Sequence, residues 1–278
     1  MNENSEASKN PPPTLQYSNT PILLSSLLTA MRTLTVLPLP GRDAAALASA
    51  LPWFPLVGFI ISAAVGLVFE AVLRWLHWPL GAAVLAVLTS VLLTGGLHLD
   101  GLADAVDGWR GGRTRERRLE IMKDSRIGAM GAIALVIMLL LQFAALARLA
   151  EQPGVALLLL PLAFILSRFA LVQLAVSLPY ARAEGGTAEL FVQGARGWHF
   201  IAALLLAAVL CGALAGAVGL LAVMVAVLLA LPLRGWMRRH FGGVTGDLLG
   251  CGCVVVETAL LLLLAALAPW LAPLPLLW

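Results

Sequence analysis

Long apolar runs, separated by a few short polar stretches, make up most of this chain. The runs are rich in Leu and Ala and show no alternation of period two, so they predict helices and not the strands of a barrel. A bilayer needs about 20 apolar residues per helix, with a range of about 17 to 25. Five runs meet that length, at residues 53–75, 80–97, 127–149, 155–178 and 254–271.

Two further runs have other lengths. Residues 199–233 are too many for one span, and the glycines at 212, 216 and 219 indicate a tight turn between two helices. Residues 22–37 are too few, and they predict an interfacial or re-entrant helix. The pattern therefore predicts an all-α fold, a polytopic membrane helix bundle with seven spans, and leaves six or eight open. We expect residues 1–20 to be a disordered polar tail and residues 21–278 to be one membrane-embedded catalytic domain.

Composition supports a membrane protein and adds little else. Apolar residues make up 60% of the chain and charged residues 12%, against about 25% charged in soluble domains. The three cysteines lack the paired spacing of a zinc site, so we expect structural thiols.

The basic residues are distributed unevenly. With seven spans, 15 of the 18 Lys and Arg residues lie on one side of the membrane, together with every polar motif. By the positive-inside rule that side is cytoplasmic.

One acidic segment directly follows the second span. In a helix, Asp100, Asp104 and Asp107 would fall at i, i+4 and i+7 and share a face. Their repulsion predicts a bound cation such as Mg²⁺, which takes carboxylate and phosphate oxygens, or compensation by the basic run that follows. A solvated helix end is the plainer alternative.

Three later stretches are candidates for binding anions. Residues 111–118 form a glycine- and arginine-rich loop that either binds phosphate or only sets topology. Residues 123–128 mix both charges before a span, as in a substrate site or a structural ion pair. Residues 242–250 are rich in glycine but lack the Lys-Ser/Thr of a P-loop. There Asp247 is a candidate metal ligand or general base, and an ordinary loop is the alternative.

Charges inside spans are costly and usually have a partner. Arg168 lies near the middle of a predicted span, so we expect it to meet Glu257 or a substrate phosphate. His98 would point away from Asp107 on a helical wheel, which argues against a catalytic role for it.

These motifs together resemble one enzyme family. HLDGLADAVDG at 98–108, RLEIMKDSRIG at 118–128 and GVTGD at 243–247 are similar to the adenosylcobinamide-GDP ribazoletransferases, or cobalamin synthases. Weaker similarity covers 35–40, 53–58 and 179–182, so the resemblance spans about residues 22–257, although Val36 stands where a basic residue is expected.

The resemblance implies a multi-pass inner-membrane transferase that joins alpha-ribazole, or its 5'-phosphate, to adenosylcobinamide-GDP and releases GMP with Mg²⁺. It implies metal ligands at Asp100, Asp104 and Asp107 and catalytic residues at Asp107, Asp124 and Asp247. Asp124 and Asp247 stay open as acceptors of the hydroxyl proton. Substrate-binding roles follow for His98, Arg117, Arg118, Lys123, Ser125, Arg126, Arg168, Gly243 and Thr245. We expect no nucleic-acid partner. A homo-oligomer, or association with other enzymes of the pathway, stays open.

Two other functions compete with this one. A CDP-alcohol phosphotransferase also uses carboxylates on membrane helices, but Asp104-Ala105 replaces here the Ala-Arg of its Asp-Gly-x-x-Ala-Arg pattern. An ion-coupled transporter would place its acids near the midplane rather than at one surface.

Overall fold

The computed structural model describes residues 22–271, so the predicted tail lies outside the described residues. Within that range the chain is helical and has no strand, only an isolated bridge between Tyr180 and Val244. The predicted all-α fold is confirmed. The helices are α1 (Ile22–Leu34), η1 (Leu47–Trp53), α2 (Phe54–Ala71), η2 (Val72–Leu76), α3 (Pro79–Thr94), α4 (Leu97–Gly111), α5 (Arg115–Ile121), α6 (Ala129–Leu149), α7 (Pro153–Ser177), α8 (Glu189–Gly194), α9 (Gly197–Phe241) and α10 (Gly246–Leu271).

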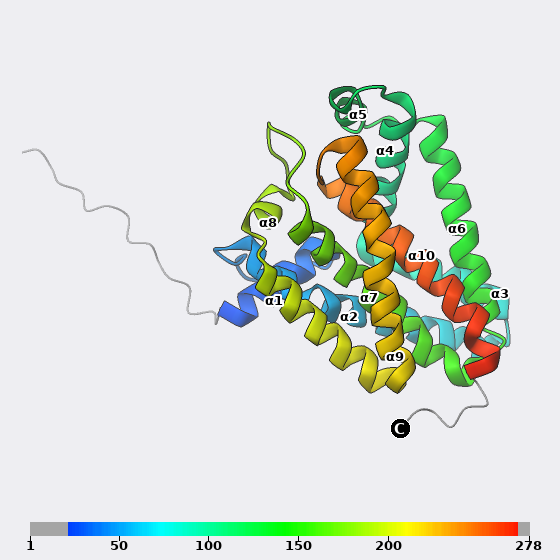
Figure 1. The fold of residues 1–278 in the computed structure, drawn as a ribbon. Helices are drawn as coiled ribbons and strands as arrows, with labels where there is room; N and C mark the ends of the chain where they lie inside the picture. The colour runs from blue at the N-terminus through cyan, green and yellow to red at the C-terminus, as the bar shows by residue number, and fades with distance from the viewer. Residues whose placement is uncertain (1–21, 272–278) are drawn as a thin grey trace, which may run out of the picture.

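The predicted number of spans is not confirmed. Five helical segments within residues 22–271 are long and apolar enough to cross a membrane, or six if the bent pair α3–α4 counts as one span. The predicted turn inside 199–233 is confirmed, because Ala215 and Gly216 leave helical geometry in the middle of α9. Figure 1 shows the result, a yellow arm that runs away from α8 and an orange arm that returns toward α5.

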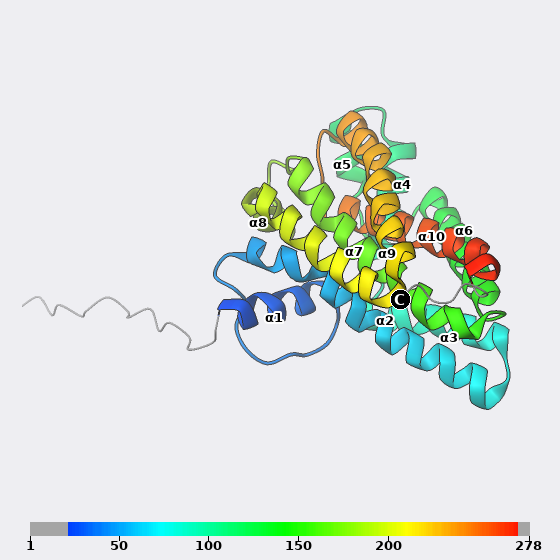
Figure 2. The same ribbon diagram turned by 60° about the horizontal axis from the view of Figure 1, so that its bottom comes forward.

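Helix α7 forms the centre of the bundle. It packs against α2, α9 and α10, and most of its side chains are buried. Gly58 of α2 lies against the backbone of Phe164, where a Cβ atom would collide. In both ribbon views the other long helices surround α7 (Figures 1 and 2).

A sharp bend separates α3 from α4. Gly95 and Gly96 both have positive φ, at 61° and 72°, a region that glycine enters without steric penalty. The chain turns by 88° there. With 15 residues and three carboxylates, α4 is too short and too polar to span a membrane by itself. The bend therefore separates an apolar helix from the helix that carries the acids.

The apolar runs that end at residue 233 and begin again at residue 254 predict a long polar loop at 234–252, and this prediction is wrong. Helix α9 continues to Phe241 and α10 begins at Gly246, so only four residues connect them. Hydropathy marks where an apolar run ends, but a helix extends beyond it when its last turn is stabilised. Arg238 and Arg239 lie in the last turn of α9, where positive charge interacts favourably with the helix dipole. Asp247 consequently lies in the first turn of α10 and not in a loop.

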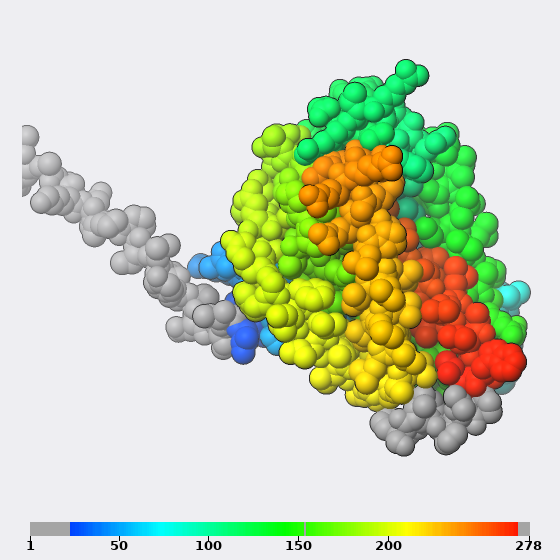
Figure 3. All heavy atoms as spheres, in the orientation of Figure 1, coloured from blue at the N-terminus to red at the C-terminus, as the bar shows by residue number. Residues whose placement is uncertain are grey.

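Several polar elements meet at one end of the bundle. Figures 1 and 3 show α5 beside the end of the orange arm of α9, with α4 and the start of α6 next to it. Arg118 joins α5 to α9, since its Nη1 donates to the His240 carbonyl at 3.0 Å. The N-terminal turn of α10 packs against α4 in the same region. The sequence motifs therefore converge at this end.

Candidate active site

The three aspartates of α4 lie on a helix as predicted, and a fourth carboxylate joins them. Asp100 is exposed, whereas Asp104 is partly buried. Burial, and then the charges of Asp100 and Asp247, raise the pKa of Asp104 to about 7. Burial disfavours the charged form of the carboxyl group, and the neighbouring negative charges add to that effect. We call Asp100, Asp104 and Asp247 the acid cluster.

Two glycines allow α4 and α10 to approach closely enough to form this cluster. A Cβ atom on Gly101 would lie 2.5 Å from the Asp247 carbonyl oxygen. A Cβ on Gly250 would lie 3.2 Å from the His98 Cα. Any larger residue at these positions would push the two helices apart. The glycines therefore determine the distance between the α4 acids and Asp247.

Asp247 has a cationic partner that our sequence analysis did not include among the site residues. Its Oδ2 accepts a hydrogen bond from Arg182 Nη2 at 2.7 Å and one from the Thr245 hydroxyl at 3.4 Å. Arg182 Nε is buried and has no partner among the described residues. The only sequence signal was the PYAR stretch at 179–182, which does not reveal a contact across 65 residues. Arg182 is the cation closest to the acid cluster.

The loop that carries Arg182 is held by backbone contacts. Ala181 N donates to Val244 O at 2.8 Å, and Val244 N donates to Pro179 O at 2.9 Å. Gly243 packs against the Pro179 carbonyl with no room for a Cβ. Thr245 is fully buried and accepts from Leu248 N at 3.2 Å, at the start of α10. In this structure Gly243 and Thr245 thus position Arg182 and Asp247, and their predicted substrate contacts stay a prediction.

Asp107 has a different environment from the other acids. Its Oδ2 accepts from Gly128 N at 2.7 Å and its Oδ1 from Gly131 N at 2.8 Å, so both oxygens cap the start of α6. Negative charge at a helix N-terminus is favourable. These contacts support a structural role, while its predicted catalytic and metal-binding roles stay predictions.

The acid cluster fits Mg²⁺ only if the substrate completes the coordination. Within residues 22–271 no group of three or more His, Cys, Asp or Glu side chains is arranged to hold a metal ion. Mg²⁺ usually takes one or two carboxylates and fills its shell with water and substrate phosphates. Asp100 and Asp104 match that requirement, because they lie one turn apart on the same face of α4.

The predicted basic residues are each engaged with a partner. Arg117 pairs with Glu120 at 2.7 Å, and Lys123 pairs with Glu184. Arg118 Nε also donates to Gly112 O, at 2.9 Å, so this residue ties the loop between α4 and α5 to α9. These contacts leave the predicted phosphate-binding roles untested.

The turn before α6 contains a strong local ion pair. Arg126 Nη2 donates to Asp124 Oδ2 at 2.6 Å, and this contact lowers the pKa of Asp124 to about 2. Ser125 lies exposed between them. A carboxylate that binds a proton so weakly is a poor general base near neutral pH. Of the two candidate bases, only Asp247 lies beside the α4 acids, so the geometry favours Asp247.

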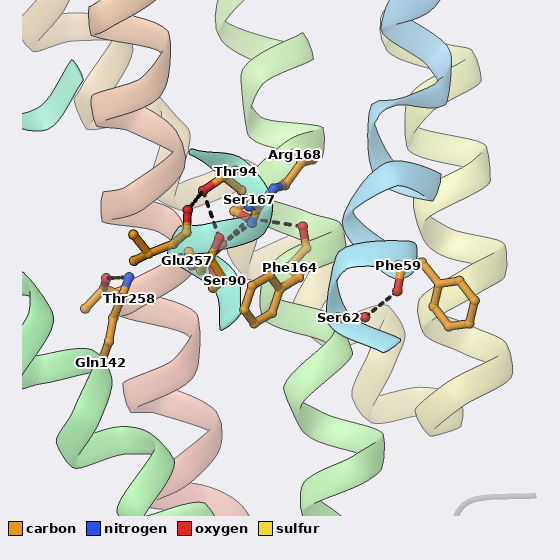
Figure 4. A network of polar contacts seen from close by, with 11 residues as sticks. Phe59, Ser62, Ser90, Thr94, Gln142, Phe164, Ser167, Arg168, Glu257 and Thr258 are labelled. Carbon is orange, nitrogen blue, oxygen red and sulfur yellow. Dashed lines mark hydrogen bonds and ion pairs between the residues drawn. The ribbon is translucent and has the colours of Figure 1, made fainter. Parts of the chain in front are cut away.

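Arg168 lies inside the bundle, where it forms an ion pair with Glu257 of α10, as predicted. Its side chain is 1% exposed. Figure 4 shows the surrounding network, in which the Ser167 hydroxyl donates to Glu257 Oε2 at 3.1 Å. The pair holds α7 against α10. Its burial does not support contact with a phosphate, and the predicted substrate-binding role remains untested.

His98 is buried at the start of α4, and its Nε2 has no partner among the described residues. Together with Asp247 it lines a cavity of about 380 Å³. Most of the other walls are apolar and come from α1, η1, α2, α7, α8 and α10. The acid cluster therefore lies at one edge of an apolar cavity.

Comparison with known proteins agrees with this arrangement. The family model for cobalamin-5-phosphate synthase matches residues 26–265. The adenosylcobinamide-GDP ribazoletransferase of Chlorobaculum tepidum is 44% identical over 247 residues, which cover 87% of this chain and 96% of that relative. The enzyme of the same name from Roseiflexus is 39% identical over 246 residues, covering 86% of this chain and 89% of that relative. No solved structure matches the chain. Because the family match includes both α4 and the start of α10, the chain belongs to the cobalamin-5-phosphate synthase family.

Proposed function

We propose that this protein is an adenosylcobinamide-GDP ribazoletransferase. It joins alpha-ribazole, or alpha-ribazole 5'-phosphate, to adenosylcobinamide-GDP and releases GMP. The observation that carries the proposal is the family match over residues 26–265, which contains the whole acid cluster and Arg182. The relatives that share 39–44% identity carry this name.

The reaction is a substitution at phosphorus. A ribose hydroxyl forms a P–O bond to the phosphorus nearer the cobinamide, and the P–O bond to GMP breaks. Charge develops on the leaving phosphate and must be compensated. Arg182 Nη2 lies 2.7 Å from Asp247 Oδ2. From there the guanidinium group can move to the pyrophosphate when substrate enters. That exchange would free Asp247 to accept the hydroxyl proton.

We further propose that Mg²⁺ is required and is held by Asp100 and Asp104 together with the pyrophosphate. When bound, Mg²⁺ would neutralise phosphate charge. The support is that Asp100 and Asp104 lie one turn apart on α4, where burial, and then the charges of Asp100 and Asp247, raise the pKa of Asp104 to about 7. Asp107 would maintain the position of α4 against α6 through its two backbone hydrogen bonds.

We place the reaction on the cytoplasmic face of the inner membrane. The support is the excess of Lys and Arg at the end of the bundle that carries the acid cluster, together with the positive-inside rule. Labelling of a single cysteine placed at the exposed Ser125 would test this orientation. Labelling only from the periplasm would refute it.

The activity itself is tested by GMP release. Purified protein in lipid nanodiscs receives adenosylcobinamide-GDP and ribazole with Mg²⁺ or with EDTA, and a parallel sample receives CDP-diacylglycerol and an alcohol. We expect GMP release that depends on both substrates and on Mg²⁺. Asp104→Ala should abolish it, whereas Glu151→Ala, an exposed acid paired with Arg148 after α6, should not. CMP release alone would refute the proposal in favour of the phospholipid enzyme.

A further inference from the structure

The cavity beside the acid cluster has two chemically different regions. Its volume is about 380 Å³, and it is lined by helices of the bundle and by the short helix α8. The inner walls are formed by the apolar side chains of Leu34, Leu51, Phe54, Leu171, Phe191 and Leu249. Its polar edge contains Asp247 of the acid cluster and the buried His98. A ligand that fits must be apolar at one end and polar at the other.

We propose that this cavity binds the aromatic base of the acceptor nucleoside. The inference rests on the proposed function, because ribazole is a nucleoside whose base is a dimethylated benzimidazole. That base is flat and apolar, and its ribose is polar. In the bound state the base lies among the apolar walls and the ribose reaches the edge at Asp247. The reacting hydroxyl is then next to the residue that accepts its proton.

The volume of the cavity suits the acceptor nucleoside and excludes the corrinoid donor. Pockets that enclose drug-sized ligands measure about 300 to 1,000 Å³, so about 380 Å³ suits a bicyclic base with part of its sugar. A corrinoid ring with its side chains is several times larger and cannot enter. The donor must therefore approach the acid cluster from outside the cavity, on the side of α4 where Asp100 is exposed.

The one buried polar group in the wall supports a heteroaromatic ligand over a lipid chain. His98 is 6% exposed, and its Nε2 has no hydrogen-bond partner among residues 22–271. A buried polar atom without a partner is unfavourable. A benzimidazole nucleoside brings a ring nitrogen and sugar hydroxyls to the wall that contains His98 and Asp247, whereas an acyl chain offers no polar atom.

The test places a large side chain in the cavity at one of the residues that line it. Ala188 lies at the start of α8, is partly buried and lines the cavity, so Ala188→Trp should block it without disturbing the core. We expect the KM for ribazole to rise at least about tenfold and the KM for adenosylcobinamide-GDP to change less than about twofold. The matched control is Ala147→Trp, at a partly buried alanine of α6, a helix that does not line the cavity. It should leave both values unchanged.

A second variant covers the case in which Ala188→Trp fails to fold. Phe191→Leu enlarges the cavity beside Phe54. The centroids of the Phe54 and Phe191 rings are 6.2 Å apart. This variant should raise the KM for ribazole and lower that for a nucleoside with a larger, tricyclic base. An increased KM for adenosylcobinamide-GDP alone, or unchanged specificity in both variants, would overturn the assignment. Loss of bound phospholipid without a change in either KM would indicate a lipid site instead.

Direct binding separates this inference from the proposed function. Titration of wild-type protein in nanodiscs with ribazole alone, without the donor, should show saturable binding that Ala188→Trp removes. If the wild-type protein releases no GMP but still binds ribazole in this way, the proposed reaction fails and the cavity assignment stands. If it releases GMP and both variants bind ribazole normally, only the cavity assignment fails.

Discussion

Replacing Gly101 by alanine should test whether the approach of α4 to α10 determines activity. The added Cβ would lie 2.5 Å from the Asp247 carbonyl oxygen, and ordinary contact begins at 3.4 Å. The helices must therefore separate by about 0.9 Å at this point. That movement takes Asp104 away from Asp247, whose charge contributes to the raised pKa of Asp104.

The expected effect on activity exceeds the effect on stability. Overpacking typically costs about 1 to 3 kcal/mol, and alanine regains about 1 kcal/mol of helix propensity over glycine. The variant should therefore fold. A misplacement of about 1 Å in an active site can cost about 100-fold in rate, so we expect kcat for GMP release to fall by about that factor.

The control for this experiment is Gly235→Ala in α9. A Cβ there meets no atom within 4 Å, so the same substitution should leave activity within about twofold of wild type and thermal stability equal or slightly higher. Both variants are measured by GMP release and by thermal unfolding in the same nanodiscs. If Gly101→Ala is folded and retains activity within about threefold, the reasoning that links this contact to the site is refuted.

Three further predictions concern charged groups. The folded-state pKa of Asp104, about 7, lies above its ordinary value of 3.8, so the folded protein binds the extra proton and stability should fall as pH rises from about 4 to about 7. Asp104→Asn should remove most of that slope, and a wild-type stability that does not change over this range would contradict the argument. Either Arg168→Met or Glu257→Gln should destabilise the protein by about 3 to 5 kcal/mol in denaturant unfolding, because each leaves a buried group without its partner. The double variant Arg168→Met/Glu257→Gln should lose less than the sum, and strict additivity would show that the pair is not coupled. Asp107→Asn should lower stability by about 1 to 3 kcal/mol, because one capping hydrogen bond to α6 is lost. It should leave the Mg²⁺ concentration needed for half-maximal activity unchanged, and a marked increase would instead make Asp107 a metal ligand.

Local sequence was sufficient for features that depend on neighbouring residues. The all-helical membrane fold, the helix that carries the α4 acids and the break near Gly216 all followed from apolar runs, residue spacing and glycine positions. The pairing of Arg168 with Glu257 was also anticipated, because a charge inside an apolar helix requires a partner and few are available.

Only the tertiary structure revealed how the polar motifs meet. Hydropathy did not predict that α9 continues to Phe241 or that α10 begins at Gly246, because a helix continues past its apolar run when its ends are stabilised. It could not show that Gly101 brings Asp247 to the acid cluster, that Arg182 pairs with Asp247, or that Asp107 caps α6. These contacts join residues 21 to 146 positions apart in the chain. Periodicity identifies which face of a helix a residue occupies, but the packing of the helices decides what that face meets.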